Sequence, residues 1–386
     1  MAFRSFPLRL IAASNAFKGS LSALQASRAM ALGARDLFRE ASVEIVPISD
    51  GGDGFLDVMR ALRGGRVTKV AVSGPLGGLI RAPLLLKERA AYIEMALASG
   101  LALLKKSRKS PDAMNASSRG TGSLIRAALD RGAREIVVGL GGSATNDGGA
   151  GMAQALGFKL LDAKGRELAP GAAPLLDLAR ILPPEPRLLG RIKEARFVGV
   201  SGVENPLLGA RGSARTFGPQ KGATPAQVRL IEKGLSRLAR VADRDLGRKV
   251  AGMPGAGAAG GLGFGLMAFL GARMRPGSDW ILKDSGLPRR LRKADAVLTG
   301  EGRLDKTSFD GKAPLILARA ARDRGIPVAI VCGSLDEAVR ARLADSGVGS
   351  VATLTEVAGN EDELFRRAPL LCRQAAALAL KRLFLA

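Results

Sequence analysis

The chain has 386 residues, of which 47% are apolar and 24% charged, a composition typical of a globular protein large enough for two domains. It contains no histidine. This excludes Ser-His-Asp and Cys-His catalysis, histidine-ligated zinc and a histidine general base. The two cysteines, Cys332 and Cys372, are too few for a disulfide framework and fit a cytoplasmic location.

The 59 Lys and Arg residues outnumber the 35 Asp and Glu residues, giving a formal net charge of +24. One interpretation is a protein that binds nucleic acid or another polyanion. The alternative, which we favour, is basic surface scattered over exposed helices, because one Trp and one Tyr leave little for base stacking. Nucleic acid is therefore not expected as a partner. A membrane is not expected either, because no apolar run reaches the ~20 residues that span a bilayer.

Apolar, β-rich runs alternate with helical patterns along the chain, which predicts an α/β fold. The basic N-terminus leads into the first run and is interpreted as a strand, not a signal peptide. Nine strands are expected, at Leu8–Ala13, Val43–Ile48, Val67–Val72, Ala91–Met95, Glu135–Leu140, Arg196–Val200, Ala294–Leu298, Val328–Cys332 and Val348–Leu354.

Two helix starts are legible as capping boxes, Ser22 with Gln25 and Thr224 with Gln227. After Thr224 the apolar residues recur at helical spacing, and a further helix is expected over 257–270. The order of elements predicts a doubly wound parallel-sheet domain (Rossmann or flavodoxin-like) from residues 1–66 and 284–386. A second α/β domain, 67–283, would be inserted in it, with the active site in the cleft between them.

Four clusters of glycine and polar residues could carry chemistry. The first, Asn15 to Ser20, includes Lys18 and lies between a strand and a capped helix, where a lysine can neutralise a carboxylate or phosphate. An ordinary turn with a solvated lysine explains it equally well. The second cluster contains Asp50, Gly51, Gly52 and Asp53.

Asp50 and Asp53 are three residues apart, so in a starting helical turn both would lie on one face and could hold Mg²⁺ or orient a substrate hydroxyl. Alternatively, Asp50 caps the helix and Asp53 complements its dipole. The surrounding glycines exceed what a cap needs, which indicates close approach to the backbone.

The third cluster follows the strand expected at 135–140 and exposes successive backbone N–H groups together with hydroxyls that can donate to phosphate. We favour a functional loop here; its candidate residues are Gly141, Gly142, Ser143, Thr145, Asn146 and Asp147. The fourth cluster, with Glu301, Arg303 and Asp305, follows the strand expected at 294–298, where open α/β sheets place their ligands. Paired charges on a surface loop are the alternative.

A fifth glycine run, Gly255 to Gly260, matches the dinucleotide pattern G-x-G-x-x-G. The preceding residues are charged and end in Gly-Met-Pro, so no strand is expected to feed the turn. A nicotinamide-dependent dehydrogenase is therefore a weaker alternative. The chain also has no G-x-x-x-x-G-K-[ST] motif and no protein-kinase signature set.

Taken in order, the clusters resemble the bacterial-type glycerate kinases from Ile11 to about Cys332. The resemblance is carried by ten motifs, which are Asn15-Ala-Phe-Lys-Gly-Ser-Leu-Ser-Ala, Ser49-Asp-Gly-Gly-Asp-Gly, Ser73-Gly-Pro-Leu-Gly, Ile93-Glu-Met-Ala-Leu-Ala-Ser-Gly-Leu, Gly120-Thr-Gly, Gly141-Gly-Ser-Ala-Thr-Asn-Asp-Gly-Gly, Glu204-Asn-Pro-Leu-Leu-Gly, Phe217-Gly-Pro-Gln-Lys-Gly-Ala-Thr, Pro254-Gly-Ala-Gly-Ala-Ala-Gly-Gly-Leu-Gly and Thr299-Gly-Glu-Gly-Arg-Leu-Asp.

The resemblance implies transfer of the γ-phosphoryl group of ATP to D-glycerate with Mg²⁺ as cofactor. The expected product is 2-phosphoglycerate. The family usually has Asp-Ser where this chain has Asn15-Ala16, so position 15 is not expected to be a base. It usually has Ala-Asp-Gly-Gly-Glu where Ser49 and Asp53 stand here, which keeps the charge and shortens its reach.

In the expected mechanism, Lys18 and Arg303 bind the glycerate carboxylate and the transferring phosphoryl group. Asp50 and Asp305 hold Mg²⁺ or orient the attacking hydroxyl, and the amides around Gly141–Thr145 bind phosphates. A related small hydroxy-acid is an alternative substrate. The oligomeric state stays open, with a homodimer as one alternative.

Overall fold

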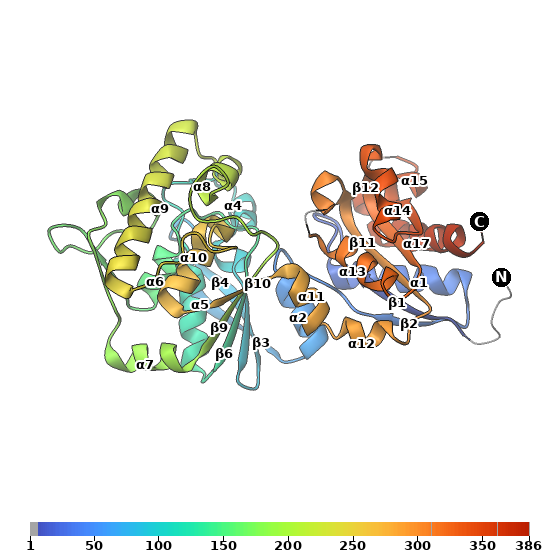
Figure 1. The fold of residues 1–386 in the computed structure, drawn as a ribbon, viewed down its shortest axis with the longest axis horizontal. Coiled ribbons are helices and arrows are strands. Elements are labelled where there is room, and N and C mark those ends of the chain that lie inside the picture. Colours follow the sequence, from blue (N-terminus) through green and yellow to red (C-terminus); the bar gives the residue numbers. More distant parts are fainter. Residues whose placement is uncertain (1–6, 310, 361, 386) are drawn as a thin grey trace. The chain divides into compact units, whose positions relative to one another are not determined.

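In the computed structural model, the structure describes residues 7–309, 311–360 and 362–385. The chain divides into two compact units (Figure 1). Unit 1 comprises Met1–Asp50, Asp57–Leu62 and Gly277–Ala386, and unit 2 comprises Gly51–Leu56 and Arg63–Pro276. The expected fold class, an α/β protein with a second inserted α/β domain, is confirmed.

The sheet of unit 1 is parallel and has the strand order β13-β12-β11-β1-β2. Its strands are β1 (Arg9–Ser14), β2 (Ser42–Ile45), β11 (Ala296–Leu304), β12 (Val328–Leu335) and β13 (Ser350–Thr353). The chain leaves β1 towards β2 in one direction and leaves β11 towards β12 in the other. The strand order therefore reverses between β1 and β11, and open α/β sheets bind ligands at such a reversal.

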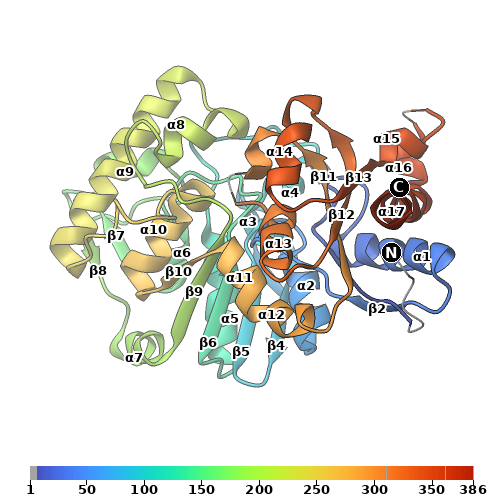
Figure 2. The ribbon, with the colours of Figure 1, turned by 45° about the vertical axis from the view of Figure 1, so that its right-hand side comes forward.

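Helices cover both faces of this sheet, because successive strand residues point to opposite faces. Leu10 and Ala12 of β1 are buried with α1 (Ala23–Leu37) and α17 (Ala368–Phe384), which lie side by side (Figure 2). Ile11 and Ala13 are buried on the other face, with α12 (Leu287–Leu291), α13 (Ala313–Arg322) and α14 (Arg340–Asp345). The other helices of the unit are α11 (Gly277–Asp284), α15 (Leu354–Val357) and α16 (Glu363–Arg366).

The sheet of unit 2 has the order β10-β9-β6-β5-β4-β3. Four of its strands pair in parallel, namely β5 (Ala90–Glu94), β6 (Glu135–Gly139), β9 (Arg196–Ser201) and β10 (Arg273–Pro276). The strand β4 (Leu79–Lys87) pairs antiparallel with both of its neighbours, β5 and β3 (Arg66–Ser73). A second, two-stranded sheet pairs β7 (Lys159–Leu161) with β8 (Arg180–Leu182). The parallel strands end at one edge, where the loops after β5 and β6 begin.

The helices of unit 2 supply its core together with the sheet. They are α3 (Ala96–Ser99), α4 (Leu101–Lys106), α5 (Arg119–Asp130), α6 (Ala150–Ala155), α7 (Pro186–Glu194), α8 (Ser213–Phe217), α9 (Pro225–Leu246) and α10 (Ala258–Leu270). The helix α2 (Phe55–Arg63) has residues in both units. In α10 the backbone of Ala259, Gly260 and Gly261 is left-handed, so the helix is interrupted there.

All nine strands expected from sequence are present, within a few residues of their predicted ends except that β11 runs on to Leu304. Both capping boxes form, at Ser22 and at Thr224. The strands not predicted are β4, β7, β8 and β10. The first contains Arg81 and Pro83, the next two have three residues each, and β10 is Arg-rich and ends in Pro276. None of the four shows the apolar β-pattern.

Helix packing in unit 1 gives a direct test of the fold. A Cβ atom at Gly33 of α1 would lie 2.1 Å from the Arg373 carbonyl oxygen of α17. Gly33→Ala should therefore destabilise the protein by about 1–3 kcal/mol, because α17 must shift. Gly190→Ala in α7 is the control, since a Cβ there meets open space. It should be neutral or stabilise by roughly 0.5–1 kcal/mol in urea unfolding. Equal stability of both variants would contradict this packing.

Candidate active site

In unit 1, the loop after β1 lies against the end of β11. The backbone N–H of Asn15 donates to the Gly300 carbonyl at 2.9 Å. A Cβ atom at Gly302 would lie 3.2 Å from the backbone nitrogen of Lys18, so the glycine permits this close approach of the two backbones. The first and fourth clusters, including Ser20, whose Oγ donates to the Phe17 carbonyl, therefore meet where the strand order reverses.

The buried centre of this region is the Glu301 side chain, of which 8% is exposed. The Ser308 hydroxyl donates to Glu301 Oε1 at 2.7 Å, and the Lys312 ammonium lies 3.7 Å from Oε2. Burial raises the pKa of the Glu301 carboxyl, and the charges of Asp50 and Asp305 act in the same direction, whereas Ser308 and Lys312 act against them. Glu301 thus retains a proton to a higher pH than an exposed glutamate.

Asp305 is held as an ionised carboxylate. Its Oδ1 accepts hydrogen bonds from the Thr307 N–H at 2.9 Å and the Thr307 hydroxyl at 2.6 Å, and the Lys312 ammonium lies 3.5 Å from it. The Thr307 hydrogen bond, with the charge of Lys312, lowers the pKa of Asp305. The Arg303 guanidinium is 3.8 Å from Asp305 Oδ2, and its side chain is 69% exposed, so it can turn towards a ligand.

Asp50 and Asp53 do not share a helical turn. The helix α2 begins at Phe55, so the expectation that both carboxylates lie on one face of its first turn is wrong. Asp50 belongs to unit 1, where its charge acts on Glu301. Asp53 belongs to unit 2, and a Cβ at Gly142 would be 2.4 Å from its Oδ1. The three glycines between and after the two acids bend the chain away from helix.

In unit 2 the second and third clusters pack directly on each other. A Cβ at Gly51 would lie 2.3 Å from the Val200 carbonyl, and one at Gly141 would lie 2.5 Å from the Gly52 Cα. These contacts require glycine, which accounts for the composition of both loops. The Glu94 carboxylate, at the end of β5, also holds the second cluster in place. It accepts hydrogen bonds from the backbone N–H groups of Gly54 and Leu56, each at 3.0 Å.

The loop after β6, residues 141–149, carries unused hydrogen-bond donors. Two of its backbone N–H groups donate to other parts of the chain, that of Ala144 to the Ser99 carbonyl and that of Gly148 to the Gly260 carbonyl. Within the described part of the chain, no acceptor is found for the backbone N–H groups of Gly141, Gly142, Ser143, Thr145, Asn146 and Asp147. Gly142 is exposed and Gly141 half-buried, so this end of the loop can reach an anion.

The other end of the loop is closed to solvent, because Thr145, Asn146 and Asp147 are 0% exposed. The Asp147 carboxylate accepts from the N–H and hydroxyl of Ser118 at 2.8 and 2.9 Å and from the N–H of Gly151 at 3.1 Å. Its other oxygen accepts from the N–H of Gly149 at 3.2 Å. Burial raises the pKa of Asp147, and these donors oppose that shift. Through these hydrogen bonds the Asp147 side chain holds the loop to the starts of α5 and α6.

Among the described residues, no group of three or more Asp, Glu, Cys or His side chains is arranged to hold a metal ion. The charges of Asp50 and Asp305 nevertheless converge on Glu301. Oxygen donors of this kind suit Mg²⁺, which is bound through one or two carboxylates with phosphate oxygens and water completing its shell. The donor set therefore fits a metal that arrives with a phosphate ligand.

The glycine run Gly255–Gly260 lacks the context of a dinucleotide-binding turn. It follows turns at 251–256, and the nearest preceding strand is β9, which ends at Ser201. Instead, Gly260 packs on the loop after β6, where a Cβ would be 1.7 Å from the Thr145 carbonyl oxygen. Gly260 thus permits close packing of α10 on that loop.

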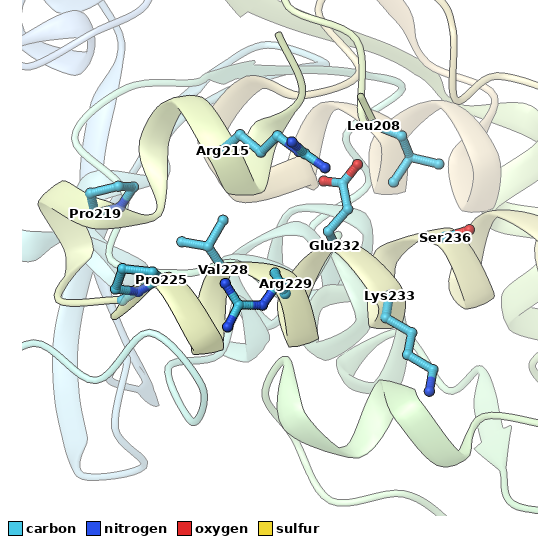
Figure 3. Close-up of a pocket in the computed structure, with 10 residues that line it drawn as sticks. Leu208, Arg215, Pro219, Pro225, Val228, Arg229, Glu232, Lys233 and Ser236 are labelled. Carbon is cyan, nitrogen blue, oxygen red and sulfur yellow. The ribbon is translucent and has the colours of Figure 1, made fainter. Parts of the chain in front are cut away.

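A surface pocket of about 960 Å³ lies between α8 and α9 (Figure 3). Arg215 of α8 and Glu232 of α9 point towards each other across it, and Arg229 and Lys233 of α9 also line it. None of the site residues predicted from sequence lines this pocket.

Four polar side chains with evident roles in these two regions were not selected from sequence: Lys312, Ser308, Glu94 and the buried Lys221. For Lys312, the available sequence signal is its place at the start of α13, seven residues after Asp305. Glu94 is a lone acid ending an apolar strand, a pattern that favours a buried, paired carboxylate.

In the described part of the chain no helix is long and apolar enough to cross a membrane.

Comparison with known proteins gives a consistent result. Residues 10–383 match the sequence model of the Glycerate kinase family. The chain is 41% identical over 370 residues to a glycerate kinase of Halalkalibacterium halodurans, covering 95% of this chain and 96% of that one. It is 39% identical over 380 residues to the glycerate 2-kinase of Escherichia coli K12, covering 96% and 97%.

Among solved structures, the chain is similar to a Salmonella typhimurium LT2 protein provisionally assigned as glycerate kinase 2. The TM-score is 0.81 at 37% identity, with 97% of this chain and 98% of that chain covered.

The raised pKa of Glu301 has a consequence for stability. Because the folded protein holds the Glu301 proton more tightly than the unfolded chain, this proton stabilises the fold at low pH. That contribution is lost as the pH rises above the ordinary glutamate value of 4.5 and through the raised pKa. Glu301→Gln, a neutral isostere, should therefore gain in unfolding temperature relative to the parent protein as the pH rises through this window.

The control is Glu337→Gln, because Arg340 lowers the pKa of Glu337 and the sign is opposite. That variant should change little, and only towards lower relative stability as the pH rises. Thermal unfolding from pH 4 to 8, followed by circular dichroism, measures both. A Glu301→Gln difference that is flat with pH would contradict the described environment.

Proposed function

The chain belongs to the glycerate kinase family, and we propose that it transfers the γ-phosphoryl group of ATP to D-glycerate, giving 2-phosphoglycerate. The observation that carries this proposal is the likeness over nearly the whole chain to proteins named as glycerate kinases. The 2-position is favoured because one relative of equal coverage is named a glycerate 2-kinase.

ATP as the phosphoryl donor is supported by the loop after β6. Backbone N–H groups without acceptors, next to an exposed glycine, are the kind of site that binds phosphate oxygens without a Walker motif. In this proposal Gly141, Gly142 and Ser143 bind nucleotide phosphates through their N–H groups. The Asp53 carboxylate lies beside Gly142 and can bind a metal ion or hydroxyl that accompanies the phosphate.

The cluster of unit 1 would supply the charges that act on glycerate and on the transferring group. Lys18 and Arg303 are exposed cations, suited to the glycerate carboxylate and the phosphoryl oxygens. Asp305, held ionised by Thr307 and Lys312, would bind Mg²⁺ or orient the attacking hydroxyl together with Asp50. Mg²⁺ would supply charge neutralisation at the phosphates. Reaction between the two domains stays a prediction.

In the bond changes of the proposed reaction, the glycerate hydroxyl oxygen forms a bond to the γ-phosphorus as the bond from that phosphorus to the ADP oxygen breaks. The hydroxyl proton is released to a carboxylate or to solvent. Little covalent chemistry is needed from the protein, which is consistent with a chain without histidine.

The proposal is tested by following ADP release with ATP, Mg²⁺ and D-glycerate, and by locating the phosphate on the product by phosphorus NMR. We expect steady turnover to 2-phosphoglycerate. Turnover with another small hydroxy-acid but not with D-glycerate would replace the substrate. A folded protein that neither binds ATP nor turns over any such acid would refute the proposal.

Site variants test the unit 1 cluster. Asp305→Asn should lower kcat by roughly 10²-fold or more, because a charge acting on the transition state is lost. Asp323→Asn, at the exposed C-terminus of α13, is the matched control and should retain activity. Near-parental activity of Asp305→Asn, with the product unchanged, would remove this residue from the mechanism.

Lys312 can be tested in the same way. Lys312→Met removes the ammonium that lies between Glu301 and Asp305 and should lower kcat by roughly 10–10³-fold. Lys306→Met is the control, since Lys306 is exposed in the same loop and has no ion pair within the described residues. If both variants behave alike, Lys312 has no special role.

A further inference from the structure

The most unusual charged side chain in unit 2 is that of Lys221, which is 1% exposed. It lies at the end of the short 3-10 helix Pro219–Lys221, between α8 and α9. Its Nζ donates to the Thr145 carbonyl at 2.7 Å. Burial lowers the pKa of Lys221 to about 7, and the charge of Asp147 opposes that shift.

A buried ammonium is costly, because it gives up its hydration and is only partly repaid by one carbonyl and one nearby carboxylate. A methionine of similar volume would fill the same space without this desolvation. A lysine at this position must therefore act through its positive charge or through its hydrogen bond to the Thr145 carbonyl.

The hydrogen bond acts on residues 145–147 of the loop, where several buried polar groups have no partner among the described residues. The Thr145 hydroxyl oxygen and the Asn146 side-chain oxygen are buried and lack a partner among the described residues, as do the N–H groups of Thr145, Asn146 and Asp147. In this stretch the Thr145 carbonyl is fixed by Lys221 on one side and by close packing of Gly260 on the other, and the Asn146 side-chain amide donates to the Ala113 carbonyl at 3.2 Å. Lys221 thus anchors the loop at its centre.

The charge acts on Asp147. This carboxylate is fully buried and belongs to the loop that carries the N–H groups of residues 141–143. Five donor groups approach it, the hydroxyl of Ser117 among them at 3.4 Å. A negative charge at this place, poorly screened by solvent, would repel an approaching phosphate. The ammonium of Lys221 offsets it.

We propose that Lys221 is a positioning residue for nucleotide phosphate binding: it fixes the Thr145 carbonyl and offsets the Asp147 charge, so that phosphate can bind the free N–H groups of residues 141–143. This inference rests on the proposed function, because it assigns the phosphates of ATP to that loop. Lys221 does not contact the substrate and acts through the loop.

The test is Lys221→Met, measured by steady-state kinetics with each substrate varied in turn. We expect the KM for ATP to rise roughly tenfold or more, since an uncompensated charge and a lost anchor both weaken phosphate binding. The KM for D-glycerate should change much less. Lys233→Met, exposed on α9 (Figure 3), is the control and should leave both KM values unchanged.

A second variant separates charge compensation from folding. Lys221→Met with Asp147→Asn removes both buried charges, so it should recover part of the lost ATP affinity and part of the lost stability relative to Lys221→Met alone. A purely structural role would lower the folded fraction, and with it the apparent kcat, while both KM values stayed at their parental values.

The proposal is overturned if Lys221→Met keeps the parental KM for ATP, or if both variants yield no folded protein, which would assign Lys221 to stability alone. A parental protein without kinase activity would instead refute the proposed function. The two failures are therefore distinguishable.

Discussion

The loop after β6 depends on one buried carboxylate. Asp147 accepts hydrogen bonds from the ends of two helices: Ser118 caps the start of α5, and Gly149 and Gly151 lie at the start of α6. It accepts from donors at both helix starts, whereas the N–H groups of residues 141–143 have no acceptor among the described residues. Because a buried charge must be compensated, this arrangement requires Lys221 and, through the tight packing on Thr145, a glycine at position 260.

Unit 1 uses the same physics at the reversal of its strand order. There the ends of β1 and β11 bring together a buried acid, an ionised acid and a lysine, namely Glu301, Asp305 and Lys312. The low dielectric around Glu301 raises the pKa of its carboxyl, whereas the hydrogen bonds from Thr307 hold Asp305 ionised. The pKa values of two neighbouring carboxyls are thus shifted in opposite directions, and Asp305, whose pKa is lowered, is the more exposed.

The sequence predicts the layers of the fold because apolar runs and capping boxes are local signals, and all nine expected strands form. It also indicates which loops carry polar groups, since these follow strands. It does not reveal partners brought together by folding: Lys221 and Thr145 are 76 residues apart, and Glu94 and Gly54 are 40 apart. The spacing of Asp50 and Asp53 was misleading because Gly51, Gly52 and Gly54 delay the helix to Phe55.

We propose that the free N–H groups of residues 141–143 bind nucleotide phosphate. Hydrogen–deuterium exchange, followed by mass spectrometry with and without Mg²⁺ and ADP, tests it most directly. We predict slower exchange in the peptide that contains Gly141, Gly142 and Ser143, and little change in the peptide of α7 that contains Gly190. Protection by ADP elsewhere in the chain, with the exchange of the 141–143 peptide unchanged, would contradict the claim.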